Sequence, residues 1–235
     1  MVCKSSKTVT VRDPPTAPES ASTTEPPSNE PRLLLVASDI KDKMTLKLGT
    51  LPNVFTVIYD VNKVSLADIV DRAEDIHNNF ITVGVLCHGG PGRLQVTQKV
   101  AITAENCVTD EEVKNFLCGL AKLTSERIDI LGCDVAASPE GKKMLKDIEE
   151  LTGTPVAGSD DKTSAAGAGA DTADGKGDLF LETAGIDVTN LYFDPVKIKA
   201  WKGEAPIPAV VGVMAMGFAS GAASAAGAKA CSLFW

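Results

Sequence analysis

The sequence predicts an α/β fold, a three-layer sandwich in which a mostly parallel six-stranded sheet carries helices on both faces. Two observations lead to this prediction. Short continuous apolar runs, which are typical of strands buried on both faces, recur along the chain. Longer segments with helical spacing of apolar residues separate them, and strands that alternate with helices of about 14 to 16 residues form parallel sheets.

Six apolar runs are expected to form the strands, in chain order residues 33–38, 54–59, 81–86, 127–131, 155–157 and 179–181. The first two are continuous apolar runs, as expected for strands buried on both faces, and the fifth is short. Two shorter apolar pieces, residues 94–96 and 100–102, are expected to pair as a small hairpin after the third strand.

Three helices are expected between the strands. The first covers residues 65–80, with Ser65 as its N-cap and an apolar stripe along one face. Residues 109–112 spell T-x-x-E, a capping box that opens the second helix. Ser138 precedes a proline at the first position of the third helix, and Gly153 ends it.

The charge and the cysteine pattern exclude several classes of function. The 235-residue chain has a net charge of −8 and a pI near 4.9, so it lacks the basic surface that binds nucleic acid. Its six cysteines form no C-x-x-C pair and it has only two histidines, so we expect no zinc site. No phosphate-binding glycine motif follows a strand. The sequence therefore predicts no cofactor and no metal.

The composition divides the chain into four segments. Residues 1–32 are rich in Pro, Ser and Thr and are expected to form a disordered leader. The α/β domain covers 33–185 and a linker covers 186–206. Residues 207–235 form a small-residue tail that is expected to be flexible or to dock on a protein partner, with a membrane-spanning helix as the alternative. Trp201 in the linker either anchors such a partner or packs the tail back onto the domain.

Cys133 and His88 are the candidate catalytic pair. Each follows a predicted strand, and ligands bind at the carboxyl ends of parallel strands. A cysteine thiolate attacks a carbonyl carbon, and an imidazolium then protonates the leaving amine. Gly89 lacks a Cβ, so its backbone N–H, together with that of Cys133, is expected to bind the developing oxyanion. Asp134, directly after Cys133, is expected to disfavour the thiolate.

These blocks resemble the caspase-like cysteine peptidases, also called clan CD. The family pattern is an apolar block before His-Gly and a second apolar block before Gly-Cys, matched here by residues 83–89 (VGVLCHG) and 128–133 (IDILGC). The two catalytic positions are 45 residues apart, close to the roughly 50 of caspases. The resemblance implies a caspase-like fold and a Cys133–His88 dyad that needs no metal for its chemistry.

A closer resemblance is to an uncharacterised bacterial domain family that is found at the N-termini of large repeat adhesins. The signature of that family runs through five ordered blocks, represented here by residues 88–96 (HGGPGRLQV), 132–136 (GCDVA), 151–153 (LTG), 156–163 (VAGSDDKT) and 178–182 (DLFLE). The resemblance covers about 150 residues and, like the first, implies the caspase-like fold.

In clan CD enzymes the pocket for the residue before the scissile bond is lined by the loops after the first and fifth strands. Here these loops contain Asp39, Ser159, Asp160 and Asp161, whose carboxylates would suit an Arg or Lys side chain. The alternative is that Asp39 caps a turn and that Asp160 and Asp161 are merely solvated.

Two functions follow from these observations. The first is a cysteine endopeptidase that acts on a peptide or protein substrate and cuts itself, within residues 164–170 or in the leader. The second is a catalytically silent scaffold of the same fold that docks on a partner or membrane through its tail. No secretory signal is visible, so a cytoplasmic or membrane-associated location is the default expectation.

Overall fold

Five of the expected strands form the central sheet of the domain. The computed structural model describes residues 29–165 and 177–205. In the sheet the strands lie in the order β2-β1-β3-β7-β8, and every neighbouring pair is parallel. Their bounds are β1 Arg32–Ala37, β2 Val54–Tyr59, β3 Phe80–Leu86, β7 Thr124–Ile130 and β8 Val156–Gly158. The predicted α/β class and mostly parallel sheet are confirmed.

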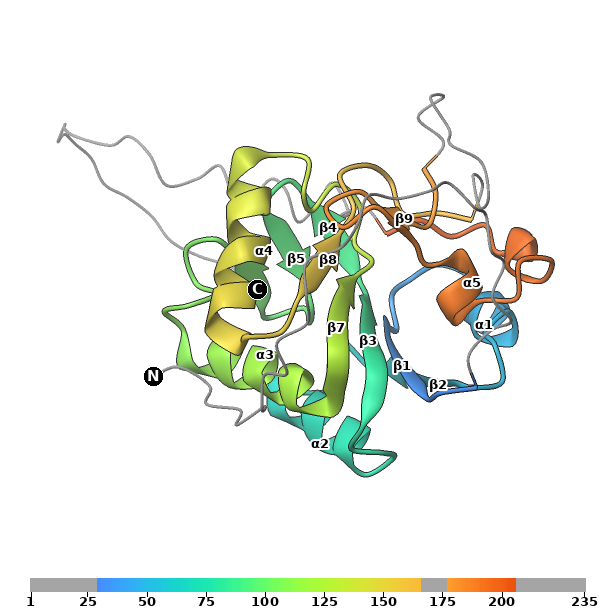
Figure 1. The fold of residues 1–235 in the computed structure, drawn as a ribbon, viewed down its shortest axis with the longest axis horizontal. Helices are drawn as coiled ribbons and strands as arrows, with labels where there is room; N and C mark the ends of the chain where they lie inside the picture. Colours follow the sequence, from blue (N-terminus) through green and yellow to red (C-terminus); the bar gives the residue numbers. More distant parts are fainter. Residues whose placement is uncertain (1–28, 166–176, 206–235) are drawn as a thin grey trace, which may run out of the picture.

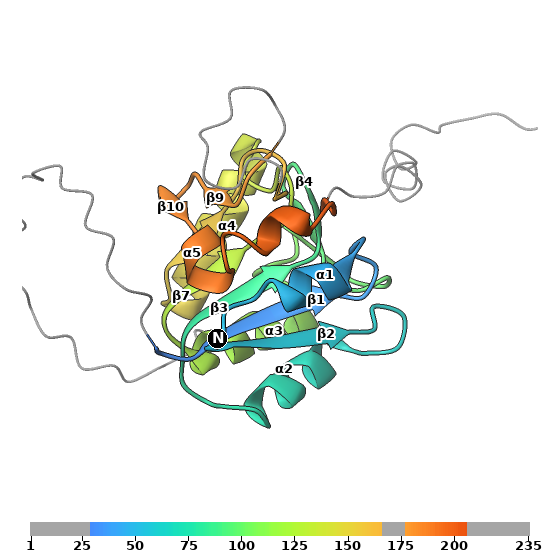
Figure 2. The same ribbon diagram turned by 90° about the vertical axis from the view of Figure 1, so that its right-hand side faces the viewer.

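Helices cover both faces of this sheet, as Figures 1 and 2 show. Their bounds are α1 Lys43–Leu48, α2 Leu66–Glu74, α3 Glu111–Leu123, α4 Pro139–Thr152, α5 Thr189–Tyr192 and the 3₁₀ helix η1 Ile198–Ala200. The helices α2, α3 and α4 form one layer, and α1, α5 and η1 lie on the opposite face. The result is a three-layer sandwich.

Two glycines show which side of the sheet each layer covers. A Cβ added to Gly84 of β3 would lie 3.1 Å from the ring of Tyr192, which belongs to α5. A Cβ added to Gly158 of β8 would lie 2.7 Å from Leu145, which belongs to α4. Because side chains alternate between the faces of a strand, such contacts assign each helix to one face.

The first predicted helix begins where expected but ends early. Ser65 caps α2 through its side chain, which accepts the amide of Asp68, while the Asp68 carboxylate accepts the amide of Ser65. The helix ends at Glu74 rather than at residue 80, so the predicted end is wrong. Phe80 instead opens β3, where it pairs with Thr124 of β7. The burial of Phe80 in the sheet therefore prevails over the helical spacing of the apolar residues.

The caps of the two longer helices are close to the prediction. Asp110, and not Thr109, caps α3, since its carboxylate accepts the amides of Glu112 and Val113. Ser138 caps α4 as expected, and Gly153 ends that helix in a left-handed conformation with φ of 67°.

A small antiparallel sheet lies beside the carboxyl edge of the central sheet. It contains β4 (His88–Gly90), β5 (Arg93–Gln95) and β6 (Ala101–Thr103) in that order. The pairing of β5 with β6 is the predicted hairpin. The additional strand β4 carries His88 and Gly89, so their backbone positions are fixed by a hydrogen-bonded ladder.

The sixth predicted strand forms, but it does not join the central sheet. It is β9 (Phe180–Leu181), which pairs with β10 (Ile186–Asp187) in a separate antiparallel ribbon. The turn that follows β9 reaches the sheet edge instead, because the Thr183 hydroxyl accepts the Gly158 amide and the Thr183 amide donates to the Gly158 carbonyl. The central sheet therefore has five strands.

Residues 186–205, expected to be a linker, pack on the domain. Tyr192 of α5 is fully buried, and its hydroxyl lies 2.8 Å from Asp129 of β7 and 2.7 Å from Thr82 of β3. Arg127 also pairs with the Asp129 carboxylate. Trp201 is 2% exposed, which agrees with the expectation that it packs back onto the domain. The packed domain therefore continues to residue 205 instead of ending at 185.

Other predicted segments lie outside the described residues. These are most of the leader, the greater part of the 164–170 loop and the whole 207–235 tail, since residues 1–28, 166–176 and 206–235 are not described. Within the two described ranges, none of the helices combines the length and apolar character needed to cross a bilayer.

Candidate active site

The predicted site residues all follow strands at one edge of the central sheet. Asp39 comes after β1, His88 after β3, Cys133 after β7, and residues 159–161 after β8. Because these four strands are adjacent and parallel, their carboxyl ends lie side by side. The topology thus gathers the loops in which sequence reasoning placed the site.

Cys133 is a fully buried thiol at the centre of this edge. Its Sγ accepts the backbone N–H of Thr163 at 3.2 Å, and the backbone N–H of Ala205 also donates to it. Burial raises the pKa of Cys133 to about 11; the two amides oppose this shift, while the charge of Asp134 adds to it. The expected effect of Asp134 is confirmed, although burial is the larger cause.

His88 is 7% exposed and faces an acid. Its Nε2 lies 3.6 Å from a carboxylate oxygen of Asp39, a distance at which a protonated imidazole forms an ion pair. The other nitrogen, Nδ1, is buried and has no hydrogen-bond partner among the described residues. A buried polar atom without a partner costs free energy, so Nδ1 is available to exchange a proton with a group that enters the site.

Gly89 lies directly against the backbone that carries Cys133. A Cβ at Gly89 would come within 2.6 Å of the carbonyl oxygen of Cys133 and the carbonyl carbon of Gly132, so only glycine fits. Its backbone N–H donates to the carbonyl oxygen of Ala205 at 2.7 Å. The amide that was predicted to bind an oxyanion therefore already binds a peptide carbonyl. The role predicted for the Cys133 amide stays a prediction.

Ser159, Asp160 and Asp161 form a hydrogen-bonded loop that closes over residues 134–136. The carbonyl of Asp161 accepts the Asp134 amide at 2.6 Å, and that of Ser159 accepts the Ala136 amide at 2.8 Å. The Ser159 hydroxyl lies 3.2 Å from the Asp161 carboxylate. This loop fixes the backbone just after Cys133, whatever role its side chains have toward a substrate.

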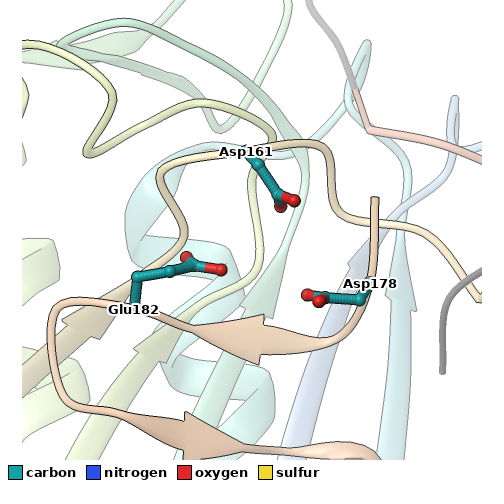
Figure 3. A group of neighbouring side chains, drawn as sticks. All are labelled: Asp161, Asp178 and Glu182. Carbon is teal, nitrogen blue, oxygen red and sulfur yellow. The ribbon is translucent and has the colours of Figure 1, made fainter. Parts of the chain in front are cut away.

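Asp161 also belongs to a cluster of three carboxylates, shown in Figure 3. Its side chain and those of Asp178 and Glu182, which lie on either side of β9, point toward one another with ligand atoms within 4.8 Å. Burial and the charges of Asp178 and Glu182 raise the pKa of Asp161 to about 6, and burial raises the pKa of Glu182. The cluster is half-buried and offers the oxygen ligands that calcium takes.

Asp39, which is predicted to line a substrate pocket, lies beside His88, a contact that the sequence did not predict. Sequence reasoning also missed two neighbours of Cys133, the amides of Thr163 and Ala205. Thr163 follows the predicted loop by only two residues. Ala205 lies in the segment expected to be a linker, and the alternation of apolar or small residues with charged ones in 201–205 (WKGEA) was the one available signal.

Comparison with known proteins identifies the family of the chain. The family model described as a domain of unknown function, DUF4347, matches residues 33–204. The chain belongs to this family. The DUF4347 match contains the predicted residues of the site, and it continues to Glu204, one residue before the described part of the chain stops.

Curated relatives of this DUF4347 chain are distant. The protein named NMDA receptor synaptonuclear signaling and neuronal migration factor is 23% identical over 136 residues in mouse and rat, and 22% identical in human. The aligned region covers 52% of this chain but only 26% of each relative. No solved structure matches the chain.

Proposed function

We propose that this DUF4347 domain is a caspase-like cysteine endopeptidase with Cys133 as nucleophile and His88 as general base and acid. The observation that carries the proposal is the placement of these two residues at the carboxyl ends of the adjacent strands β3 and β7. The contact of Gly89 with the Gly132–Cys133 backbone brings the two loops together.

In this mechanism, His88 takes the Cys133 proton as the sulfur attacks the carbonyl carbon of a peptide. Asp39, 3.6 Å from Nε2, stabilises the imidazolium that forms and holds the ring so that Nδ1 faces the reaction. The Gly89 N–H donates to the oxyanion. The imidazolium then protonates the leaving amine, and water hydrolyses the thioester with His88 as base.

In the conformation described, the Cys133 thiol is protonated and buried, so it is unreactive. With a pKa of about 11, Cys133 is protonated near neutral pH, and its side chain is fully buried. Attack therefore requires that His88 takes the thiol proton and that a bound substrate displaces the groups now hydrogen-bonded to the sulfur. We expect the activity of the wild-type chain to be low for this reason.

A peptide-library assay tests the proposal. Cys133→Ala and His88→Ala are each compared with the full chain, and again with a Trp201→Ala variant, which loosens the segment whose Ala205 amide donates to the Cys133 sulfur. We expect each dyad substitution to remove cleavage, a loss of at least about 10³-fold. Cys107→Ala is the matched control, since Cys107 is a second free buried thiol away from the site. Cleavage that persists in Cys133→Ala refutes the assignment.

The same library tests which side chain precedes the scissile bond. A preference for Arg or Lys stays a prediction that rests on Asp39, Asp160 and Asp161, of which Asp39 also lies 3.6 Å from His88. It predicts that Asp161→Asn lowers cleavage after basic residues more than cleavage after alanine. Equal effects on both substrates would contradict a role of Asp161 in substrate selection.

A silent scaffold is the second candidate, and the complete burial of the Cys133 sulfur favours it. In that case the fold binds a partner, and the 207–235 tail, which lies outside the described residues, docks on a protein or a membrane. Deletion of 207–235 would then change the oligomeric state measured by light scattering or the partition into lipid vesicles. An unchanged oligomeric state and an unchanged partition would contradict docking through the tail.

A further inference from the structure

The last described segment of the chain lies over the candidate site in an extended form. Along residues 201–205 the side chains alternate between buried and exposed: Trp201, Gly203 and Ala205 face inward, and Lys202 and Glu204 face solvent. A period of two is that of an extended strand. The backbone of Glu204 also forms an antiparallel bridge with Ser164. The segment therefore lies in the site as a strand-like peptide would.

A single residue of this segment contacts both elements of the proposed chemistry. The Ala205 carbonyl oxygen accepts the Gly89 N–H at 2.7 Å, and the Ala205 N–H donates to the Cys133 sulfur. In the mechanism above, the same N–H of Gly89 holds the carbonyl that is attacked. Ala205 thus occupies the position of the residue before a scissile bond, with its carbonyl oxygen on the predicted oxyanion donor.

Two features upstream hold the segment in place. The Trp201 indole is buried and donates to the Lys41 carbonyl at 2.9 Å, which ties the segment to the loop after β1. Gly203 passes so close that a Cβ would lie 2.3 Å from the same carbonyl oxygen and 2.3 Å from the Trp201 ring nitrogen. Only glycine allows this approach. A larger residue at 203 would have to move the segment away.

We propose that Trp201–Ala205 is a built-in pseudosubstrate that occupies the peptide-binding cleft of the Cys133–His88 pair and must leave before another peptide enters. This inference rests on the proposed function and adds its regulation. It also names the ligand of the cleft as an extended peptide, bound through its backbone to Gly89 and to the edge formed by Ser164.

The peptide bond between Ala205 and Pro206 explains why the segment is not cleaved while it occupies the site. Ala205 is followed by Pro206 in the sequence. The nitrogen of an X–Pro bond carries a ring carbon in place of hydrogen, which crowds the atom that the general acid must protonate. A carbonyl held on Gly89 next to such a nitrogen binds as a substrate does but is a poor substrate for cleavage.

The test is the rate at which iodoacetamide alkylates Cys133 in the full chain, followed by peptide mass spectrometry. The thiolate displaces iodide and forms a carbon–sulfur bond, so the rate reports exposure and ionisation of the sulfur without any need for peptidase activity. Trp201→Ala and Gly203→Val are both expected to raise the rate by about tenfold or more, because they increase the population with the segment released.

Two controls sharpen the measurement. Lys202→Ala changes an exposed side chain of the same segment and is expected to leave the rate unchanged. Cys87 is a buried free thiol in the same chain and reports general loosening. A rise confined to Cys133 in both variants supports the proposal. No rise, or a parallel rise at Cys87 in both, overturns it, because the segment would then be an ordinary part of the core.

A further substitution separates the failure of this inference from failure of the proposed function. His88→Ala is added to Trp201→Ala and the alkylation is repeated near pH 6. If release raises the rate and His88→Ala leaves that raised rate unchanged, the segment covers the cleft but the dyad is not a functional pair. If His88→Ala lowers the raised rate, both proposals are supported.

A synthetic Gly-Glu-Ala peptide, amidated at its end, tests whether the site binds an extended peptide. It should slow the alkylation of Cys133 in the Trp201→Ala variant, and an unchanged rate would contradict peptide binding.

Discussion

At the carboxyl edge of the sheet, burial shifts the pKa values of Cys133 and Asp161 more than the residues next to them in the sequence do. Cys133 has a raised pKa chiefly because its sulfur is removed from water, and two backbone amides only partly compensate. Asp39 belongs to the site because its carboxylate lies 3.6 Å from His88, a contact that no sequence motif indicates. Asp161 shows the same effect among acids, since burial is the main cause of its raised pKa. These environments were not visible in the sequence because each depends on residues that are distant along the chain.

The pH dependence of stability follows from Asp161. Its pKa is raised from 3.8 to about 6, so the folded state holds the proton more tightly than the unfolded state. The contribution of this carboxyl to stability therefore falls as the pH rises from about 4 through about 6. Asp161→Asn removes this loss, and above pH 6 the variant is expected to be more stable by up to about 1 kcal/mol, because the group is partly exposed.

Chemical denaturation at several pH values, in the presence of a chelator, measures this effect. The advantage of Asp161→Asn should shrink as the pH falls from about 6 toward 4 and vanish only well below 3.8, where the wild-type carboxyl is protonated in both states. Asp71→Asn, at an exposed position of α2, is the control for the loss of one carboxylate. A variant that is less stable at pH 7 than at pH 4, relative to wild type, would contradict the prediction.

At the scale of elements, capping residues in the sequence predicted the helix ends that they form. The side-chain caps at Ser65 and Ser138 placed the starts of α2 and α4 correctly, and the left-handed Gly153 placed the end of α4, because a cap acts within one turn. The end of α2 was predicted too late in the chain. The helices α1, α5 and η1 were missed. Each has six residues or fewer and no capping side-chain hydrogen bond, so tertiary packing and not local sequence stabilises them.

The docking of α5 gives a prediction for its tyrosine. Tyr192→Phe removes a hydroxyl that lies between Asp129 and Thr82, both fully buried. Leaving a buried carboxylate with one partner fewer is expected to cost about 1–3 kcal/mol. Tyr59→Phe, which changes the other tyrosine, is the matched control. The Tyr59 hydroxyl lies beside the Cys87 thiol and has no nitrogen or oxygen partner among the described residues, so its removal should be nearly neutral.

Thermal and denaturant unfolding of both tyrosine variants decide the comparison. The destabilisation of Tyr192→Phe should also appear as faster proteolysis within residues 186–205, since α5 holds that region on the sheet. Equal losses in the two variants would mean that the hydrogen bonds of Tyr192 contribute nothing beyond ring packing.

At the scale of the whole molecule, the site was predictable as far as the parallel sheet determines it. Adjacent parallel strands bring the loops after β1, β3, β7 and β8 to one edge, so the gathering of Asp39, His88 and Cys133 follows from strand order. The position of the segment Trp201–Ala205 over the site was not predictable in this way. Ala205 reaches Gly89 and Cys133 across more than 70 residues of chain, and five residues of alternation do not show which surface they cover.

The extent of the packed domain yields the last prediction. A chain that ends at residue 205 keeps every described buried contact, whereas one that ends at 185 loses four large side chains that are at most 2% exposed: Tyr192, Phe193, Ile198 and Trp201. Each contributes roughly 1.5–3 kcal/mol by burial, and their sum is comparable to the whole stability of about 5–15 kcal/mol that domains have. The shorter chain would also expose Asp129 and Thr82 on the face of the sheet. We therefore expect cooperative unfolding for 1–205 and a loss of cooperative unfolding for 1–185, measured by denaturation and limited proteolysis. A stable 1–185 would show that 186–205 is the linker that its sequence predicts, and the pseudosubstrate would then have no folded anchor.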